Sequence, residues 1–250
     1  MRTHLLLALL ASAILGLLCW HMWALFPFKL LVVLMHESGH AAATLLMGGS
    51  VDTISVSPDE AGATWSRYAP TFLNTVVIKS AGYVGSTVSG CVLLQAAARS
   101  KEGKWPLIAL AVWTGLVSVL WVRDPFTLAF SLGCTVMMGL LARFGPTLLR
   151  RMLLAFLASF SVLYALIDIK DDLLHLGGSG GSDADALAQA TFIPAIVWGL
   201  GWGALSLVLV FFTLRNIFRM PAAQPQARPG ASDGLPTSAA VPQADAERVP

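Results

Sequence analysis

Charged residues are scarce in this sequence. Only 12% of its 250 residues are Asp, Glu, Lys or Arg, about half the share of a typical soluble domain, and 56% are hydrophobic. This composition excludes an ordinary soluble globular protein, and it excludes a mainly disordered chain, which needs low hydrophobicity and high net charge. A formal net charge of +2 provides no polybasic surface, so we expect no nucleic-acid partner. The three cysteines lie in apolar stretches, which predicts packing residues and not a disulfide framework: Cys19, Cys91 and Cys134.

The hydrophobic residues are grouped in long blocks, as in integral membrane proteins. A helix that crosses the bilayer needs roughly 20 mostly apolar residues. The sequence contains about seven such segments, which predicts an all-α polytopic membrane protein with about 6–7 transmembrane helices. The segments lie near 5–25, 29–47, 73–98, 105–122, 125–142, 152–169 and 192–214.

Two stretches differ from these blocks. Residues 48–70 are polar and carry β-branched residues on both sides of the turn sequence from Pro58 to Gly62, which predicts a small β-hairpin. Residues 220–250 form a Pro/Ala/Gln-rich tail that cannot bury a core, so we expect this tail to be disordered.

Basic residues between the segments predict the orientation of the later helices. Three clusters fall on one side if those helices alternate, and the positive-inside rule makes this the cytoplasmic side. The loop over 170–189 then lies on the other side and is acidic. The basic residues are Arg99, Lys101 and Lys104, then Arg143, Arg150 and Arg151, then Arg215 and Arg219.

A short polar motif interrupts the second hydrophobic segment. The residues from His36 to His40 read His-Glu-Ser-Gly-His and match the pattern H-E-x-x-H. On a helix, residues four apart share one face, so both imidazoles can bind one Zn²⁺ while Glu37 takes a proton from a water on the metal. Ionisable groups inside a membrane helix are expensive, which favours a functional site over a polar contact between helices.

A zinc site of this type needs a third protein ligand. The richest candidate segment is the end of the sixth hydrophobic stretch, where three carboxylates share a helical face. We favour Asp168 because it lies nearest the membrane interior, with Asp172 as the second choice and His175 as the third. A solvated helix end is the alternative interpretation of this cluster. The sequence identifies no substrate-binding residue.

The motif residues resemble the site-2 protease family of intramembrane zinc metallopeptidases, and especially a compact branch found in bacteria, plants and fungi. That branch has the pattern Tyr-x-x-x-Asp-Ile-x-Asp-Asp, followed by Ser-Asp-Ala and a Trp-Gly pair. Other members carry the ligand Asp in Asn-Pro-Asp-Gly or Leu-Asp-Gly, and neither sequence occurs here. The resemblance covers about residues 25–215 and rests on His36–His40, a small-residue segment at 81–85, Tyr164, Asp168–Asp172, Ser182–Ala184 and Trp198–Gly199.

The resemblance implies a membrane-embedded metalloprotease-like domain over residues 1–219. It implies a zinc-dependent endopeptidase that cleaves a membrane protein or peptide, with Glu37 as the catalytic base and His36, His40 and Asp168 as metal ligands. We expect an integral, multi-pass protein of the bacterial inner or plasma membrane. Two alternatives stay open: a non-catalytic membrane protein with a structural metal site, and a small transporter with an ion path of His, Glu and Asp residues.

Overall fold

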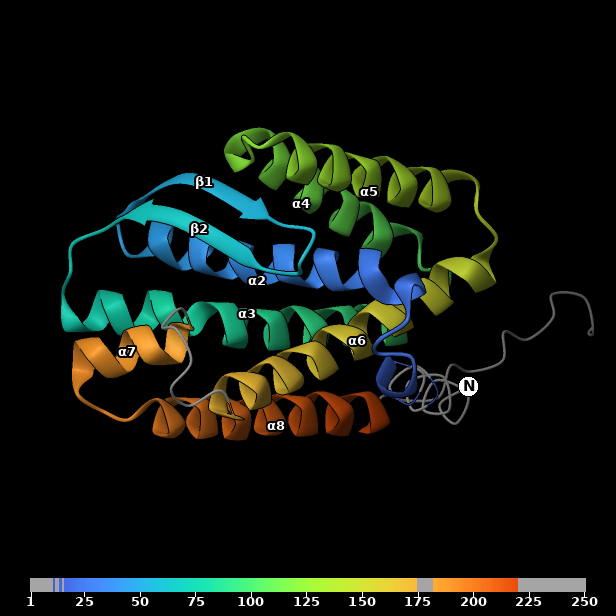
Figure 1. Ribbon diagram of the computed structural model, residues 1–250. Helices are drawn as coiled ribbons and strands as arrows, with labels where there is room; N and C mark the ends of the chain where they lie inside the picture. The colour runs from blue at the N-terminus through green and yellow to red at the C-terminus, as the bar shows by residue number, and fades with distance from the viewer. Residues whose placement is uncertain (1–10, 12–13, 15, 175–181, 220–250) are drawn as a thin grey trace, which may run out of the picture. The chain divides into compact units, whose positions relative to one another are not determined.

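A computed structural model describes residues 11, 14, 16–174 and 182–219, with the backbone alone for 171–174 (Figure 1). Nine of the 21 residues of the predicted first segment lie outside these residues, and the predicted disordered tail lies outside them entirely. The elements are the short 3₁₀ helix η1 (Trp23–Leu25), α2 (Phe26–Leu46), β1 (Ser50–Val56), β2 (Gly62–Arg67), α3 (Phe72–Arg99), α4 (Lys104–Trp121), α5 (Pro125–Phe144), α6 (Thr147–Leu174), α7 (Asp183–Thr191) and α8 (Ala195–Arg219).

The prediction of a helical membrane protein with a small hairpin is confirmed. Among the described residues, five helices are long and apolar enough to cross a membrane: α3, α4, α5, α6 and α8. Helix α2 corresponds to the second predicted segment. It has 21 residues but is not one of these five. Lys29 and the motif from His36 to His40 interrupt its apolar residues.

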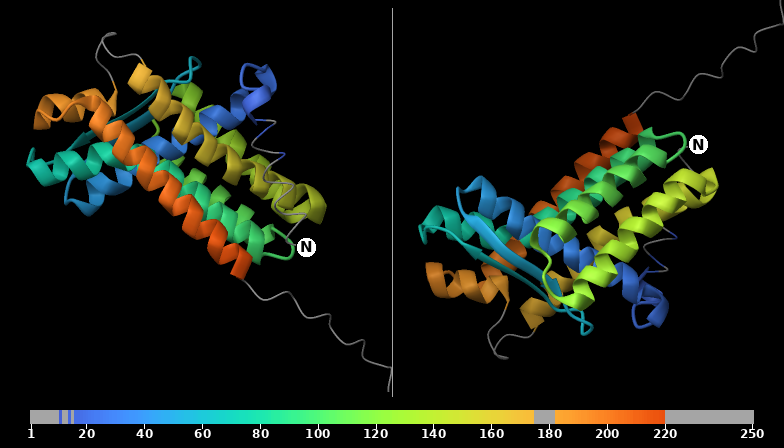
Figure 2. Two further views of the ribbon diagram at one scale, coloured as in Figure 1. Left: turned by 90° about the horizontal axis from the view of Figure 1, so that it is seen from below. Right: turned by 90° about the horizontal axis from the view of Figure 1, so that it is seen from above.

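Helix α2 is the central element of the described fold. Its apolar residues from Leu30 to Met35 are all buried, and so are Glu37 and His40. Helices α3 and α6 and the hairpin pack around it (Figures 1 and 2). The motif therefore lies inside the protein and is shielded from lipid by other elements.

Small residues allow α2 and α3 to approach each other closely. A Cβ atom at Gly39 of α2 would clash with the carbonyl oxygen of Ala81 in α3, and one at Gly85 would lie 3.2 Å from the Cα of Gly39. Small-residue pairs of this kind let membrane helices pack backbone to backbone. This contact brings the amino-terminal part of α3 directly against the face of α2 that carries the histidines.

The hairpin lies along α2. Its strands β1 and β2 are antiparallel, and their pairing runs from Ser50 opposite Arg67 to Val56 opposite Gly62. The outer side of β1 contacts the connection between α4 and α5. Ile54 forms a parallel bridge with Val122, and the hydroxyl of Thr127 bonds both the N–H and the carbonyl of Val56 at 2.8 Å. Among the described strands, β2 pairs only with β1. Its other edge therefore carries no sheet partner.

The connections at one end of the helices confirm part of the predicted topology. The Arg150 guanidinium is buried, and it donates to the carbonyls of Glu102, at 3.1 Å, and Ala142, at 3.0 Å. The α3–α4 and α5–α6 connections, which carry two of the basic clusters, therefore lie together. This is the arrangement that alternating helices require.

Candidate metal centre

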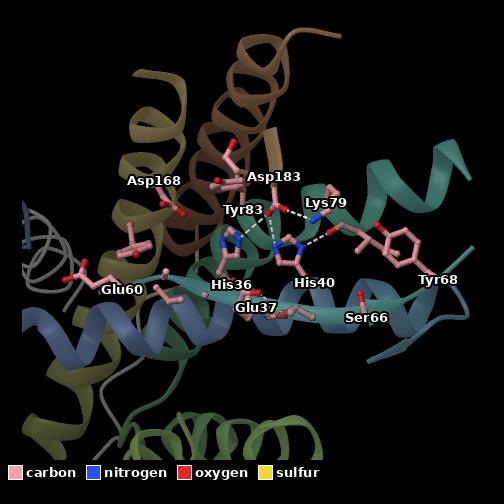
Figure 3. Close-up of a pocket in the computed structure, with 18 residues that line it drawn as sticks. His36, Glu37, His40, Glu60, Ser66, Tyr68, Lys79, Tyr83, Asp168 and Asp183 are labelled. Carbon is pink, nitrogen blue, oxygen red and sulfur yellow. Dashed lines mark hydrogen bonds and ion pairs between the residues drawn. The ribbon is translucent and has the colours of Figure 1, made fainter. Parts of the chain in front are cut away.

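Two histidines of α2 and one aspartate of α7 meet in a cavity between α2, α3, α6, α7 and β2 (Figure 3). The Nε2 atoms of His36 and His40 lie 3.5 Å and 2.8 Å from the Oδ2 atom of Asp183. Three donor atoms, one from each residue, lie within 4.8 Å of one another. Donor atoms about 2.0–2.2 Å from a tetrahedral Zn²⁺ lie roughly 3.4 Å apart, so the spacing and the donor types fit this ion.

The histidines are fixed in orientation by their other contacts. His40 donates from Nδ1 to the carbonyl of Ile78 at 2.7 Å, which turns Nε2 into the cavity. The His36 ring packs edge-on against Tyr83 at 4.8 Å, and Tyr83 stacks on Trp202 of α8. The helix spacing of four places both rings on one face, as the sequence predicts.

The third donor group, a carboxylate, comes from the first turn of α7. Ser182 is the N-cap of this helix and accepts from the N–H of Asp185, which sets the start of the helix and so the position of Asp183. Burial alone would raise the pKa of the Asp183 carboxyl, but hydrogen bonds with His36 and His40 hold that pKa well below its usual range. Asp183 is therefore ionised at neutral pH and offers an anionic oxygen to a cation.

Lys79 of α3 completes the surroundings of Asp183. Its Nζ atom lies 3.3 Å from Oδ1, the carboxylate oxygen that faces away from the histidines (Figure 3). The two oxygens thus have separate partners, with Oδ2 near the imidazoles and Oδ1 held by a cation. This arrangement is typical of outer contacts that orient a ligand carboxylate.

Gly82 provides the space in which the histidines converge. A Cβ atom at this position would clash with the Nε2 atoms of both His36 and His40. No other residue type can lie here without displacing the two donor atoms. The close approach of α3 therefore shapes the cavity as well as the helix contact.

Glu37 lies beside the histidines and beneath the hairpin. Its carboxylate oxygen Oε2 accepts from the Thr64 hydroxyl of β2 at 2.7 Å. A Cβ at Gly62 would clash with the same carboxylate, so β2 passes directly over it. The hairpin is also tied to α2 at its tip, where the buried Lys29 ammonium lies 3.0 Å from Oε1 of Glu60.

The structure brings together His36, Glu37 and His40 from the sequence analysis, but it groups Asp183 with the histidines instead of Asp168. Asp168 lines the same cavity from α6. Asp172 belongs to α6, and its side chain lies outside the described residues, as does His175. Asp183 is not among the ligands expected from the sequence. The available signal was the Ser182–Ala184 segment of the resemblance.

Comparisons with known proteins agree with this geometry. Residues 7–213 match the Peptidase M50B-like family. Searches of the curated proteins and of the solved structures gave no match. The family match covers most of the chain, and the helical membrane fold and the His-His-Asp cluster are consistent with it. The chain therefore belongs to the Peptidase M50B-like family of metallopeptidases.

Proposed function

We propose that the protein is a zinc-dependent intramembrane endopeptidase. One observation carries the proposal: the donor atoms of His36, His40 and Asp183 converge in a cavity that also holds the Glu37 carboxylate. Two imidazoles and one carboxylate are the ligand set of several catalytic zinc sites, which keep a further position for water or substrate. Bound there, Zn²⁺ would lower the pKa of a coordinated water and polarise the scissile carbonyl.

Glu37 supplies the proton transfers. Its position next to His36 places a carboxylate in the same cavity as the donor atoms, where it accepts a proton from the attacking water and passes it to the leaving amine. The Thr64 hydroxyl bonds only one of its oxygens, at 2.7 Å, and so fixes the orientation of the carboxylate. A purely structural metal site has no need of this residue.

Asp183 is the proposed third ligand, with Asp168 as a wall of the cavity. The distance of 2.8 Å between Asp183 Oδ2 and His40 Nε2 supports this choice. Lys79 keeps the carboxylate turned so that one oxygen faces the imidazoles. These contacts hold a ligand from α7 over two ligands from α2.

The substrate is proposed to be a membrane protein segment that adopts an extended conformation along β2. Residues Gly62, Ala63, Thr64 and Ser66 of this strand line the cavity. One side of the hairpin packs on the α4–α5 connection, while the other edge of β2 pairs with no described strand. An extended peptide pairs readily with such an edge, which would bring its backbone beside the donor atoms.

The proposal is tested by expressing the full chain in bacterial membranes and mapping new peptide termini by mass spectrometry. Wild type is expected to produce termini inside membrane segments, and removal of zinc by a chelator should abolish them. The His36→Ala variant should lose both zinc and cleavage. His21→Ala, an exposed histidine outside the cavity, is the matched control and should retain both.

Three results contradict the proposal. Termini that persist in His36→Ala would assign the cleavage to another protein. One zinc per chain in that variant would remove His36 from the metal site. Zinc binding at full stoichiometry without any zinc-dependent termini would favour the alternative of a structural metal site in a non-catalytic membrane protein.

A further inference from the structure

A second cavity lies between α3 and α8, with a volume of about 490 Å³. Its lining residues from α3 recur at spacings of three and four, so they form one face of that helix. Two residues of α8 complete the other side. The lining residues are Val88, Cys91, Val92, Gln95, Ala96 and Arg99 of α3, and Leu209 and Thr213 of α8. None of them lines the metal-centre cavity.

This groove is mostly apolar and runs along α3 and α8. Both helices are long and apolar enough to cross a membrane. The side chains of Val88 and Val92 are exposed on its rim, and Gln95 joins the two helices by donating to the carbonyl of Thr213 at 3.3 Å. The lining extends over twelve residues of α3, and the first and last are about 16 Å apart at 1.5 Å per residue.

The volume identifies the kind of occupant. A helix with its side chains is about 10–12 Å across, so a 16 Å length of helix occupies more than about 1,200 Å³. A groove of about 490 Å³ cannot enclose a helix of a second copy or of a substrate. Its length of about 16 Å suits a single extended hydrocarbon chain.

Among the described residues that line the groove, the one charged side chain is Arg99, at one end. Arg99 is exposed in the last turn of α3, and Arg219 is in the last turn of α8. The ends of these two helices lie side by side (Figure 2). Basic residues at the cytoplasmic end of helix grooves attract anionic lipid headgroups. We propose that the groove between α3 and α8 binds one anionic phospholipid, with an acyl chain along Val88–Ala96 and its phosphate beside Arg99.

Native mass spectrometry of the delipidated full chain tests this site. Dioleoyl phosphatidylglycerol should bind more tightly than dioleoyl phosphatidylcholine, which has the same chains. Arg99→Gln should weaken phosphatidylglycerol binding about fivefold, the effect of one arginine near the membrane surface. It should weaken phosphatidylcholine binding less, because the choline ammonium offsets the charge of the phosphate. Ala96→Phe should fill the groove and remove the tight site for both lipids. Arg143→Gln, an exposed arginine on α5, is the matched control and should have no effect.

Three results overturn the proposal. Equal binding of the two lipids would remove the role of charge. An Arg143→Gln variant that loses as much affinity as Arg99→Gln would show attraction to the membrane surface in general. A dimer in wild type that dissociates in Ala96→Phe would identify the groove as a contact between copies. Because Arg99→Gln alters an exposed side chain, its result does not depend on whether Ala96→Phe folds.

Discussion

The substitution Gly82→Ala is expected to abolish tight zinc binding while leaving the helix intact. A Cβ at this position clashes with the Nε2 atoms of His36 and His40, which are the proposed donor atoms. Moving α3 away from α2 would break the close backbone packing of Gly39 against Ala81. The two rings must therefore rotate away from each other.

The expected loss of zinc affinity can be compared with the effect of changing one residue around a metal ligand. Changing a residue that only orients a ligand lowers metal affinity about 10–100-fold. Displacing two donor atoms together should exceed the upper value, which corresponds to more than about 2.7 kcal/mol of binding free energy. Alanine is the better helix former by about 1 kcal/mol, so the substitution itself does not weaken α3.

Zinc affinity is measured by competition with a chromogenic chelator, with the thermal midpoint recorded in parallel. Gly133→Ala is the matched control, because a Cβ at that glycine meets no atom within 4 Å. This control should keep wild-type zinc affinity. If Gly82→Ala binds zinc within threefold of wild type, the proposed position of the metal between these histidines is refuted.

Three further predictions concern the contacts around the site. Asp183→Asn should lower zinc affinity at least 100-fold, whereas Asp168→Asn should change it less than tenfold; the reverse order in a chelator competition would make Asp168 the ligand. Lys79→Met should lower zinc affinity about tenfold, Lys79→Arg should restore it, and an unchanged affinity in Lys79→Met would contradict the orienting role. Glu60→Gln should destabilise the protein by about 3 kcal/mol in unfolding from mixed micelles, because it removes the anionic partner of the buried Lys29 ammonium and leaves it over the Trp20 ring, 4.7 Å from the ring centroid. Lys29→Met should destabilise it by about 1 kcal/mol or less, because the Glu60 side chain is 32% exposed and reaches water; equal losses would contradict this difference.

The sequence predicts the helices and the hairpin well because local patterns determine them. Six predicted segments coincide with α2, α3, α4, α5, α6 and α8, and the turn from Pro58 to Gly62 separates two strands as expected. Phe192 is the main exception. The apolar pattern predicts that Phe192 starts the last segment. In the structure it is the C-cap of α7, in a left-handed conformation with φ of 61°.

The motif on α2 is predictable because its geometry depends on one helix. His36 and His40 are four residues apart, so any helix brings them to one face. The identity of the third ligand depends on how three distant elements pack, and the spacing of residues along the chain does not reveal this packing. Asp183 is 143 residues after His40, and its position depends on the docking of α7 against Tyr83 and Trp202.

Lys79 illustrates the same limit for a single side chain. A lysine near the start of a membrane helix is most simply explained by reaching for the surface. The structure instead directs it to Asp183, at 3.3 Å. The difference depends on where α7 lies, which local sequence cannot give.

The most direct test of the proposed chemistry compares zinc content and peptide-bond cleavage in wild type and Glu37→Gln. The carboxamide is nearly the same size but cannot accept the proton. We expect one zinc per chain in both proteins and cleavage reduced at least 100-fold in Glu37→Gln. Unchanged cleavage at full zinc occupancy would contradict the assignment of Glu37 as the base, and with it the proposed peptidase.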